Sequence, residues 1–186
     1  MGNKTHKNHL LRALMEDNDS IAVYFTENIA QEDAGRISFF KGEKICDFNI
    51  YNLFNTKLVI KTPPMNIKDL YYIGFDKERI PVIPFGVLDK NEFFYEGNDL
   101  GLTYSKEQST VKLWAPTAIS ININIYDDLR SGVSKKYQLS EKENGIWEVV
   151  LTGDFKGKFY NFNVSGSLPE FDETRNVLDP YAKCVI

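Results

Sequence analysis

The sequence predicts an all-β protein, and three observations support this prediction. The 186 residues include 10 Tyr and 13 Phe, and aromatic side chains favour strands because flat rings pack well on pleated surfaces. Short segments in which apolar and polar residues alternate recur along the chain, separated by Gly, Pro and Asn-Gly turn signals. Hydrophobic residues make up 42% of the chain and charged residues 26%, which are ordinary globular values and argue against disorder.

We expect a first, β-sandwich-like domain over residues 1–92 that begins with a short helix. The segment THKNHLLRALMEDND carries the helical signal, and Thr5 is placed to cap its start. Four apolar residues of this segment share one helical face: Leu10, Leu11, Leu14 and Met15. The strands expected after it are SIAVYFT, RISFF, ICDFNIY and KLVIK. Prolines in RIPVIPFGV predict that residues 76–92 form an edge or connecting segment, because proline cannot donate a hydrogen bond to a sheet.

A second domain is expected over residues 93–186, where the alternation is stricter. In TVKLWA and SININIYDD the apolar residues face one way and the polar residues the other. Asn144-Gly145 is a strong hairpin-type turn signal before the segment IWEVVL. The segment GKFYNFNV has its inward residues at Tyr160, Phe162 and Val164. Short strands at this spacing predict an immunoglobulin-like β-sandwich of about 100 residues.

Charge and composition exclude several classes of function. The net charge is −4, and no basic patch stands out that could neutralise a phosphate backbone, so we expect no nucleic-acid partner. No apolar run is long enough for a signal peptide or a membrane span, so we expect a cytoplasmic protein without a membrane partner. Cys46 and Cys184 are too few for a disulfide framework, and we expect both to be reduced and buried.

The sequence offers no catalytic residues and no metal or cofactor site. His6 and His9 could touch one metal ion from a helix, but no third ligand lies nearby, so we expect them to be solvent-exposed helix residues. The acidic pairs Asp127-Asp128 and Asp172-Glu173 are typical of solvated loops, since glycoside hydrolysis needs carboxylates held across a cleft. We therefore expect that this chain alone is not an enzyme.

One group of residues could form a contact surface. If residues 110–115 and 120–126 pair as a hairpin, its outward face carries Lys112, Trp114, Asn122, Asn124 and Tyr126. Flat aromatic rings stack on the apolar face of a sugar while amides bond its hydroxyls, so this face suits a glycan. The same residues also suit contact with a neighbouring domain, which we favour because an exposed Trp usually marks an interface.

Four short motifs, taken in order, resemble one known protein family. They are residues 95–101 (YEGNDLG), 113–118 (LWAPTA), 157–162 (GKFYNF) and 179–183 (DPYAK). From about Phe93 to the end, the chain resembles the N-terminal, non-catalytic region of type I pullulanases. The first domain is similar to the additional N-terminal β-domain of the same enzymes.

The resemblance implies that residues 93–186 are a carbohydrate-binding module of family 48 with an early-set immunoglobulin-like fold. It also implies a partner, a (β/α)₈ barrel of glycoside hydrolase family 13 that follows in the parent chain and hydrolyses α-1,6 linkages in pullulan, glycogen and amylopectin. The link to that barrel would run through Asp179, Pro180 and Tyr181. Glycogen-binding relatives place a Trp where this chain has Leu168 and Phe171, so we expect the module mainly to brace the barrel, while contact with branched α-glucan stays open as a second role.

Two other functions stay open on the sequence. One is a stand-alone glycan-binding module that targets a partner to α-glucan through Trp114 and Tyr126. The other is a protein-interaction adaptor, as many immunoglobulin-like sandwiches are.

Overall fold

The computed structural model describes residues 8–128, 130 and 132–183 and confirms the all-β prediction. Strands make up 51% of the structure and helical turns 9%. The chain divides into two compact units, Met1–Asp89 and Lys90–Ile186. The short 3₁₀ turn η3 (Asn91–Phe93) therefore belongs to the second unit.

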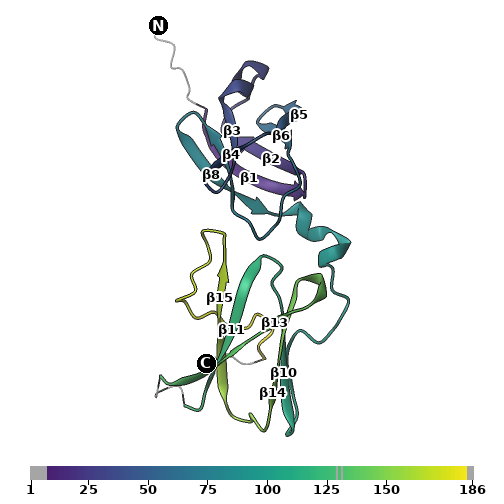
Figure 1. Cartoon of the computed structure of the whole chain (residues 1–186), viewed down its shortest axis with the longest axis vertical. Coiled ribbons are helices and arrows are strands. Elements are labelled where there is room, and N and C mark those ends of the chain that lie inside the picture. The colour runs from purple at the N-terminus through teal and green to yellow at the C-terminus, as the bar shows by residue number, and fades with distance from the viewer. Residues whose placement is uncertain (1–7, 129, 131, 184–186) are drawn as a thin grey trace. The chain divides into compact units, whose positions relative to one another are not determined.

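In the described part of the first unit, eight strands form one sheet in the order β4-β3-β7-β8-β1-β2-β6-β5 (Figure 1). Their bounds are β1 Leu10–Asp17, β2 Ser20–Phe25, β3 Ile37–Lys41, β4 Lys44–Cys46, β5 Asn49–Phe54, β6 Lys57–Lys61, β7 Tyr71–Phe75 and β8 Glu78–Pro84. The rings of Phe25 on β2 and Phe75 on β7 meet edge to face at 5.1 Å, whereas a flat sheet would separate these strands by about 14 Å. The sheet therefore folds over on itself and encloses an apolar core between its two halves.

The expected N-terminal helix is wrong, because Leu10–Asp17 forms strand β1. This strand lies between β8 and β2 in the interior of the sheet, and its residues Ala13, Leu14 and Met15 are buried in succession. A strand covered on both faces carries a continuous apolar run. Over so few residues, periodicity does not distinguish that run from a helix. Thr5, the expected cap, lies outside the described residues.

The proline-rich segment also differs from the prediction, because β8 is an interior strand and not an edge. From Glu78 to Pro81 it pairs with β7 in antiparallel orientation, and from Val82 to Pro84 it pairs with β1 in parallel orientation. Pro81 is thus the last residue of β8 that pairs with β7, and Pro84 is the last that pairs with β1. At the end of a ladder a missing N–H interrupts few hydrogen bonds. Beyond β8 the chain continues as the connecting 3₁₀ turn η2 (Gly86–Asp89).

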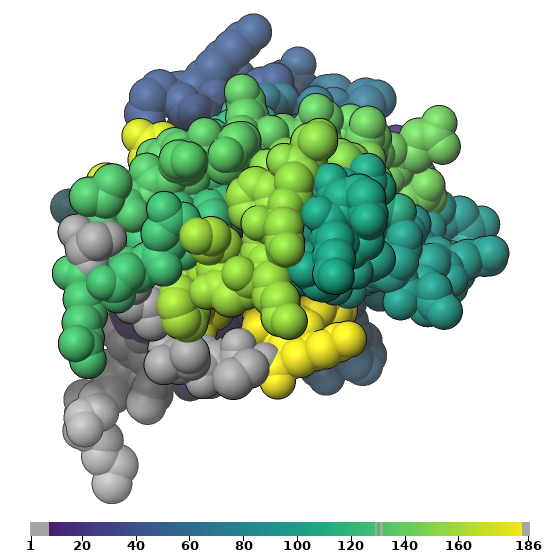
Figure 2. All heavy atoms as spheres, turned by 90° about the horizontal axis from the view of Figure 1, so that it is seen from below, coloured from purple at the N-terminus to yellow at the C-terminus, as the bar shows by residue number. Residues whose placement is uncertain are grey.

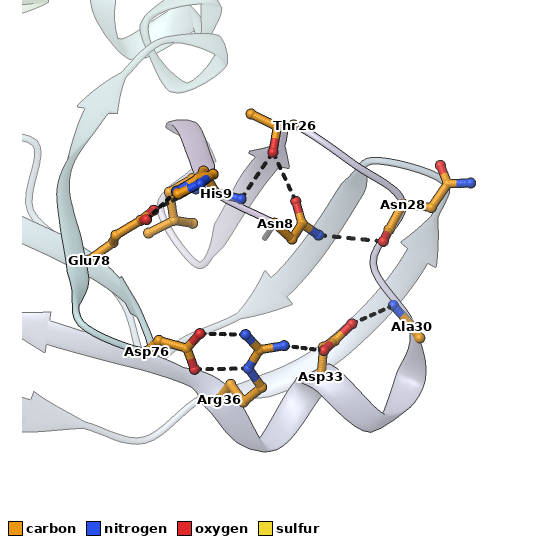
Figure 3. Close-up of polar contacts among 10 residues, drawn as sticks. Asn8, His9, Thr26, Asn28, Ala30, Asp33, Arg36, Asp76 and Glu78 are labelled. Atoms are coloured by element: carbon orange, nitrogen blue, oxygen red, sulfur yellow. Dashed lines mark hydrogen bonds and ion pairs between the residues drawn. The ribbon is translucent and has the colours of Figure 1, made fainter. Parts of the chain in front are cut away.

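Polar contacts hold the start of β1 (Figure 3). The backbone N–H of His9 donates to Thr26 Oγ1 at 3.0 Å. The ring of His9 pairs with Glu78, whose second carboxylate oxygen accepts the Leu10 N–H at 3.0 Å. His9 is thus engaged by a carboxylate from β8 and does not stand on a helix, while His6 lies outside the described residues.

A second cluster in Figure 3 holds the 3₁₀ turn η1 (Gln31–Arg36) against the end of β7. Arg36 donates its Nε to Asp76 at 2.8 Å and its Nη1 to Asp33 at 2.5 Å. Its guanidinium also lies 4.2 Å from the ring centre of Phe75. Asp33 in turn accepts the Ala30 N–H at 3.0 Å, so one arginine ties the turn to the sheet.

The second unit is a sandwich of two antiparallel sheets, ordered β13-β14-β10-β9 and β12-β11-β15 (Figure 1). Its strands are β9 Gly101–Tyr104, β10 Gln108–Trp114, β11 Ala118–Tyr126, β12 Ser134–Gln138, β13 Ser140–Glu141, β14 Ile146–Thr152 and β15 Phe159–Gly166. Apolar residues fill the space between the sheets: Val111, Leu113, Ile121, Ile123, Ile125, Trp147, Leu151 and Phe162. Figure 2 shows the heavy atoms of the chain as spheres, with the second unit in green to yellow.

The predicted turn at Asn144-Gly145 lies between β13 and β14, in the 3₁₀ turn η4 (Glu143–Gly145). Both residues have positive φ, 58° and 72°, the region that asparagine and glycine tolerate best. A Cβ on Gly145 would lie 2.7 Å from the ring of Pro116. The Pro116 turn therefore packs directly on this glycine.

Candidate functional site at the exit edge of the second unit

The expected hairpin of β10 and β11 is wrong, because the two strands lie in different sheets. β10 pairs with β9 and β14, and β11 pairs with β12 and β15. Alternation predicts which side of each strand faces the core, but it does not specify which strands pair. Lys112 and Trp114 therefore lie on the outer face of one sheet, and Asn122, Asn124 and Tyr126 on the outer face of the other.

Trp114 is anchored within its own unit. Its indole Nε1 donates to the backbone oxygen of Phe93 at 2.8 Å, and the residue remains 38% exposed. The bond ties the segment that enters the unit to the last residue of β10. Trp114 thus has a structural role and still leaves part of its ring open to a partner.

Lys112 is the centre of a small polar cluster on the same face. Its Nζ donates to Asp99 at 2.6 Å and lies 3.6 Å from Glu148. Tyr95 donates its hydroxyl to Asp99 as well. Hydrogen bonds from Lys112 and then from Tyr95 hold the pKa of the Asp99 carboxyl below its ordinary value. A Cβ on Gly97 would lie 2.3 Å from the Tyr95 ring. The glycine of the YEGND motif therefore leaves room for Tyr95, and the loop can fold over Lys112.

The asparagines of the other outer face bond to one another. Asn124 is only 2% exposed, and its Nδ2 donates to the side-chain oxygens of Asn161 and Asn163, both at 2.8 Å. Asn161 and Tyr126 share a weaker contact at 3.3–3.4 Å. Asn122 is half-buried beside them. The amides that could bind sugar hydroxyls are therefore largely engaged by the protein.

The same network secures residues 175–181, near the C-terminal end of the described residues, which we name the exit strap. Asn163 Nδ2 donates to the backbone oxygen of Arg175 at 3.0 Å. Phe162 and Val177 exchange two backbone hydrogen bonds of 2.9 and 2.8 Å, which form an antiparallel bridge. The exit strap thus covers the open edge of β15, which would otherwise present unpaired backbone groups.

Asp179, the first predicted link residue, fixes the exit strap further along. It is 4% exposed, and it accepts hydrogen bonds from the Tyr160 hydroxyl at 2.7 Å and from the Tyr181 N–H at 2.8 Å. Burial, together with the bond to Asp179, raises the pKa of Tyr160. Pro180 lies between these anchored residues and is exposed.

Tyr181 lies over the start of β9. Gly101 begins that strand with φ of +86°, and a Cβ there would be 2.7 Å from Tyr181 Cβ and 3.5 Å from Asp179 Oδ2. Gly101 and Tyr160 belong to the motifs recognised in the sequence, where no role was predicted for Gly101 and Tyr160 was predicted only to face inward. A glycine at the first position of a strand signals close backbone approach, which could have identified Gly101. Three distant motifs therefore meet at one edge, between β9 and β15.

The remaining candidates from the sequence do not join this edge. Asp127 pairs with Lys158 at 2.8 Å, and Asp172 accepts two hydrogen bonds from Thr174 within one turn. Cys46 is a half-buried free thiol, and Cys184 lies outside the described residues. Among residues 8–128, 130 and 132–183, no group of three potential ligands could hold a metal ion. No helix in that part of the chain is long and apolar enough to span a membrane.

The second unit is similar in sequence to known proteins. Residues 99–182 match the model of carbohydrate-binding module 48, described as the isoamylase N-terminal domain. The pullulanase of Bacillus subtilis (strain 168) is 33% identical over 95 residues, which are 51% of this chain and 12% of that protein. Pullulanase 1, chloroplastic, of Arabidopsis thaliana is 32% identical over 100 residues, 53% of this chain and 10% of that protein. The chain thus spans a small fraction of these curated relatives.

Solved structures are similar over both units. The pullulanase from Bacillus acidopullulyticus matches with a TM-score of 0.75 and 14% identity over 94% of this chain and 35% of that one. The Group B Streptococcus pullulanase SAP matches with a TM-score of 0.72 and 20% identity over 95% of this chain and 24% of that one. At such identities the likeness concerns the fold. Residues 99–182 therefore match carbohydrate-binding module 48, and the chain resembles the N-terminal region of type I pullulanases.

Proposed function

We propose that this chain is the accessory N-terminal region of a glycosidase that cleaves α-1,6 linkages in branched glucans, and that its second unit braces the catalytic barrel. The observation that carries the proposal is the exit strap. It is held at Arg175 by an amide, at Val177 by a backbone bridge and at Asp179 by a tyrosine hydroxyl. A domain that follows a segment fixed in this way starts from a defined position, whereas a flexible linker would leave it free to move.

The surface beside the exit strap suits such a partner. Leu178 is 59% exposed and Tyr181 44% exposed, although both stand next to the buried Asp179. Apolar side chains that stay exposed on an otherwise anchored segment favour contact with another protein surface. The catalytic barrel of the same parent chain is the partner that we propose for them.

The first test is the size of the native protein. An antibody raised against this 21.4 kDa chain should detect a band in the source cells that is heavier by at least a barrel of roughly 250 residues. A band at the mass of the chain itself would contradict the proposal. The same antibody, applied to cell fractions, tests the cytoplasmic location that we propose for the protein.

The second test uses the full-length enzyme. Tyr160→Phe should lower its thermal midpoint and its residual activity on pullulan after heating, because the exit strap loses the anchor at Asp179. Tyr104→Phe is the matched control, since Tyr104 also donates to an aspartate, Asp154 at 2.8 Å, in a loop away from the exit strap. If a barrel without this N-terminal region kept full stability and activity, the bracing role would be wrong.

Contact with branched α-glucan is the second proposed role, and the exposed part of Trp114 favours it. Titration of the chain with maltoheptaose should show saturable binding that Trp114→Ala abolishes. Val150→Ala is the matched control, because Val150 is 50% exposed on the same outer face but carries no ring to stack on a sugar. No detectable binding by the unsubstituted chain would exclude a glycan site.

A further inference from the structure

The second unit contains a cavity between its two sheets, at the end of the sandwich where β9 ends and β15 begins. Its volume is about 40 Å³. Most of its wall is apolar and is built by Leu102, Val111, Ile123, Ile125, Leu151 and Phe155. The tyrosines 104 and 160 and the residues Lys158 and Phe159 complete the lining. The cavity is thus an opening into the core and lies apart from the outer face that carries Trp114.

Ser109 also lines the cavity and supplies a buried hydroxyl to its wall. It lies on β10, where Tyr104 and Leu151 are its cross-strand partners, and it is 2% exposed. Its Oγ is the one buried side-chain polar atom in the described part of the chain that has no hydrogen-bond partner. An unpaired buried hydroxyl costs about 1–3 kcal/mol, and native proteins leave few of them. A hydrogen-bond partner for Ser109 Oγ would have to lie in the cavity.

The size and the chemistry of the cavity restrict its occupant. A water needs roughly 10–15 Å³ and two to four polar partners, and a cavity that binds benzene has about 150 Å³. The two tyrosine hydroxyls already donate to carboxylates, Tyr104 to Asp154 at 2.8 Å and Tyr160 to Asp179 at 2.7 Å. A cluster of waters would therefore find few partners, while a benzene ring would be too large.

We propose that this cavity binds a hydroxymethyl group, a hydroxyl on a single carbon, because a cavity of about 150 Å³ holds the six carbons of benzene and about 40 Å³ therefore holds one or two non-hydrogen atoms. The hydroxyl pairs with Ser109 Oγ, and the carbon contacts Val111 and Leu151. The same chemistry occurs in a free alcohol and in the hydroxymethyl arm of a hexose. Tyr104, which is 41% exposed at the mouth of the cavity, offers a ring on which a hexose could stack.

Nuclear magnetic resonance titration of the whole chain with methanol tests this site. The backbone amides of residues 109, 111 and 151 should shift and saturate, and Ser109→Ala should weaken the affinity at least fivefold. Ser120→Ala is the matched control, because Ser120 Oγ already bonds Ser165 Oγ at 2.7 Å; it should leave the affinity unchanged. Shifts that do not saturate, or that persist unchanged in Ser109→Ala, would overturn the proposal.

A parallel titration with methyl α-D-glucoside identifies the source of the hydroxyl. Saturation by the glucoside with the same dependence on Ser109 would assign the site to a hexose arm, and saturation by methanol alone would assign it to a free alcohol. Waters alone in the cavity of a crystal grown with methanol would overturn the proposal.

Unfolding in urea provides a readout that needs no ligand. Ser109→Ala should leave the midpoint unchanged or raise it, since it removes an unpaired hydroxyl. Ser120→Ala should lower the midpoint, because it removes a hydrogen-bond partner of Ser165. Equal losses in both variants would mean that Ser109 Oγ already has a partner, and the proposal would then be wrong.

Discussion

Gly101 leaves open the space that Tyr181 occupies: a Cβ on the glycine would lie 2.7 Å from Tyr181 Cβ. The glycine belongs to the YEGNDLG motif near the start of the second unit, and the tyrosine belongs to the DPYAK motif at its end. With Tyr160 and Asp179, they form the edge of the sandwich against which the exit strap packs. Motifs that are distant in sequence thus serve one structural purpose, the fixing of the exit strap.

Gly101→Ala should destabilise the chain more than Gly157→Ala does. Both glycines have positive φ, +86° and +73°, but a Cβ on Gly157 would have no atom within 4 Å. The second substitution should therefore lower the free energy of unfolding by about 1 kcal/mol of backbone strain, and the first by at least about 2 kcal/mol because Tyr181 must also move. Urea unfolding measures both. Equal losses would mean that Tyr181 does not pack on Gly101.

Tyr160→Phe should remove part of the loss of stability at alkaline pH. The pKa of Tyr160 in the folded chain is raised above the ordinary value of 10.0 by burial and by Asp179. The stabilisation that the Tyr160 hydroxyl contributes is therefore complete below pH 10. It is lost as the pH rises towards the pKa of Tyr160 in the folded chain, because the unfolded chain releases the tyrosine proton at lower pH. Urea midpoints from pH 8 to 11 should fall less steeply in the variant. Parallel curves would contradict the assignment.

Asp99→Asn should flatten the dependence of stability on pH in the acid range. Lys112 and Tyr95 lower the pKa of the Asp99 carboxyl, so its contribution is present above the unfolded pKa and is lost as the pH falls through the folded one. On acidification, the free energy of unfolding should therefore fall more in the unsubstituted chain than in the Asp99→Asn variant. Because the pair is partly exposed, added salt should reduce the difference. The measurement is a series of urea midpoints between pH 2 and 6.

Asn124→Ala should destabilise the chain far more than Asn122→Ala, although both residues lie on the outer face of β11. Removal of the Asn124 amide leaves the side-chain oxygen of Asn163 without its donor and leaves that of Asn161 with only the weak bond from Tyr126 at 3.4 Å, and an acceptor that loses its donor away from water costs about 1–3 kcal/mol. Asn122 is half-buried, so its truncation should cost about 0.5 kcal/mol or less. Similar losses in the two variants would argue against a special role of the buried network.

The strict alternation of β10, β11 and β15 determined by itself which side of each strand faces the core. Ile121, Ile123 and Ile125 are all buried as the pattern predicts, because side chains of a strand point to opposite faces in turn. The turn at Asn144-Gly145 could also be predicted, since few other residues adopt two successive positive φ angles. The four short motifs predicted the resemblance to the family because each of them consists of a few neighbouring residues.

Only the tertiary structure decided which strands pair, and therefore which side chains share a surface. Alternation is a property of one strand, whereas pairing depends on contacts between distant segments, so Trp114 and Asn124 were assigned to one face and lie on two. The interior positions of β1 and β8 could not be predicted from the sequence either. Because β1 is buried on both faces, its apolar run resembles that of a helix. β8 changes its partner strand along its length, which allows two prolines in an interior strand. The contact of Gly101 with Tyr181 required both ends of the second unit to meet in space.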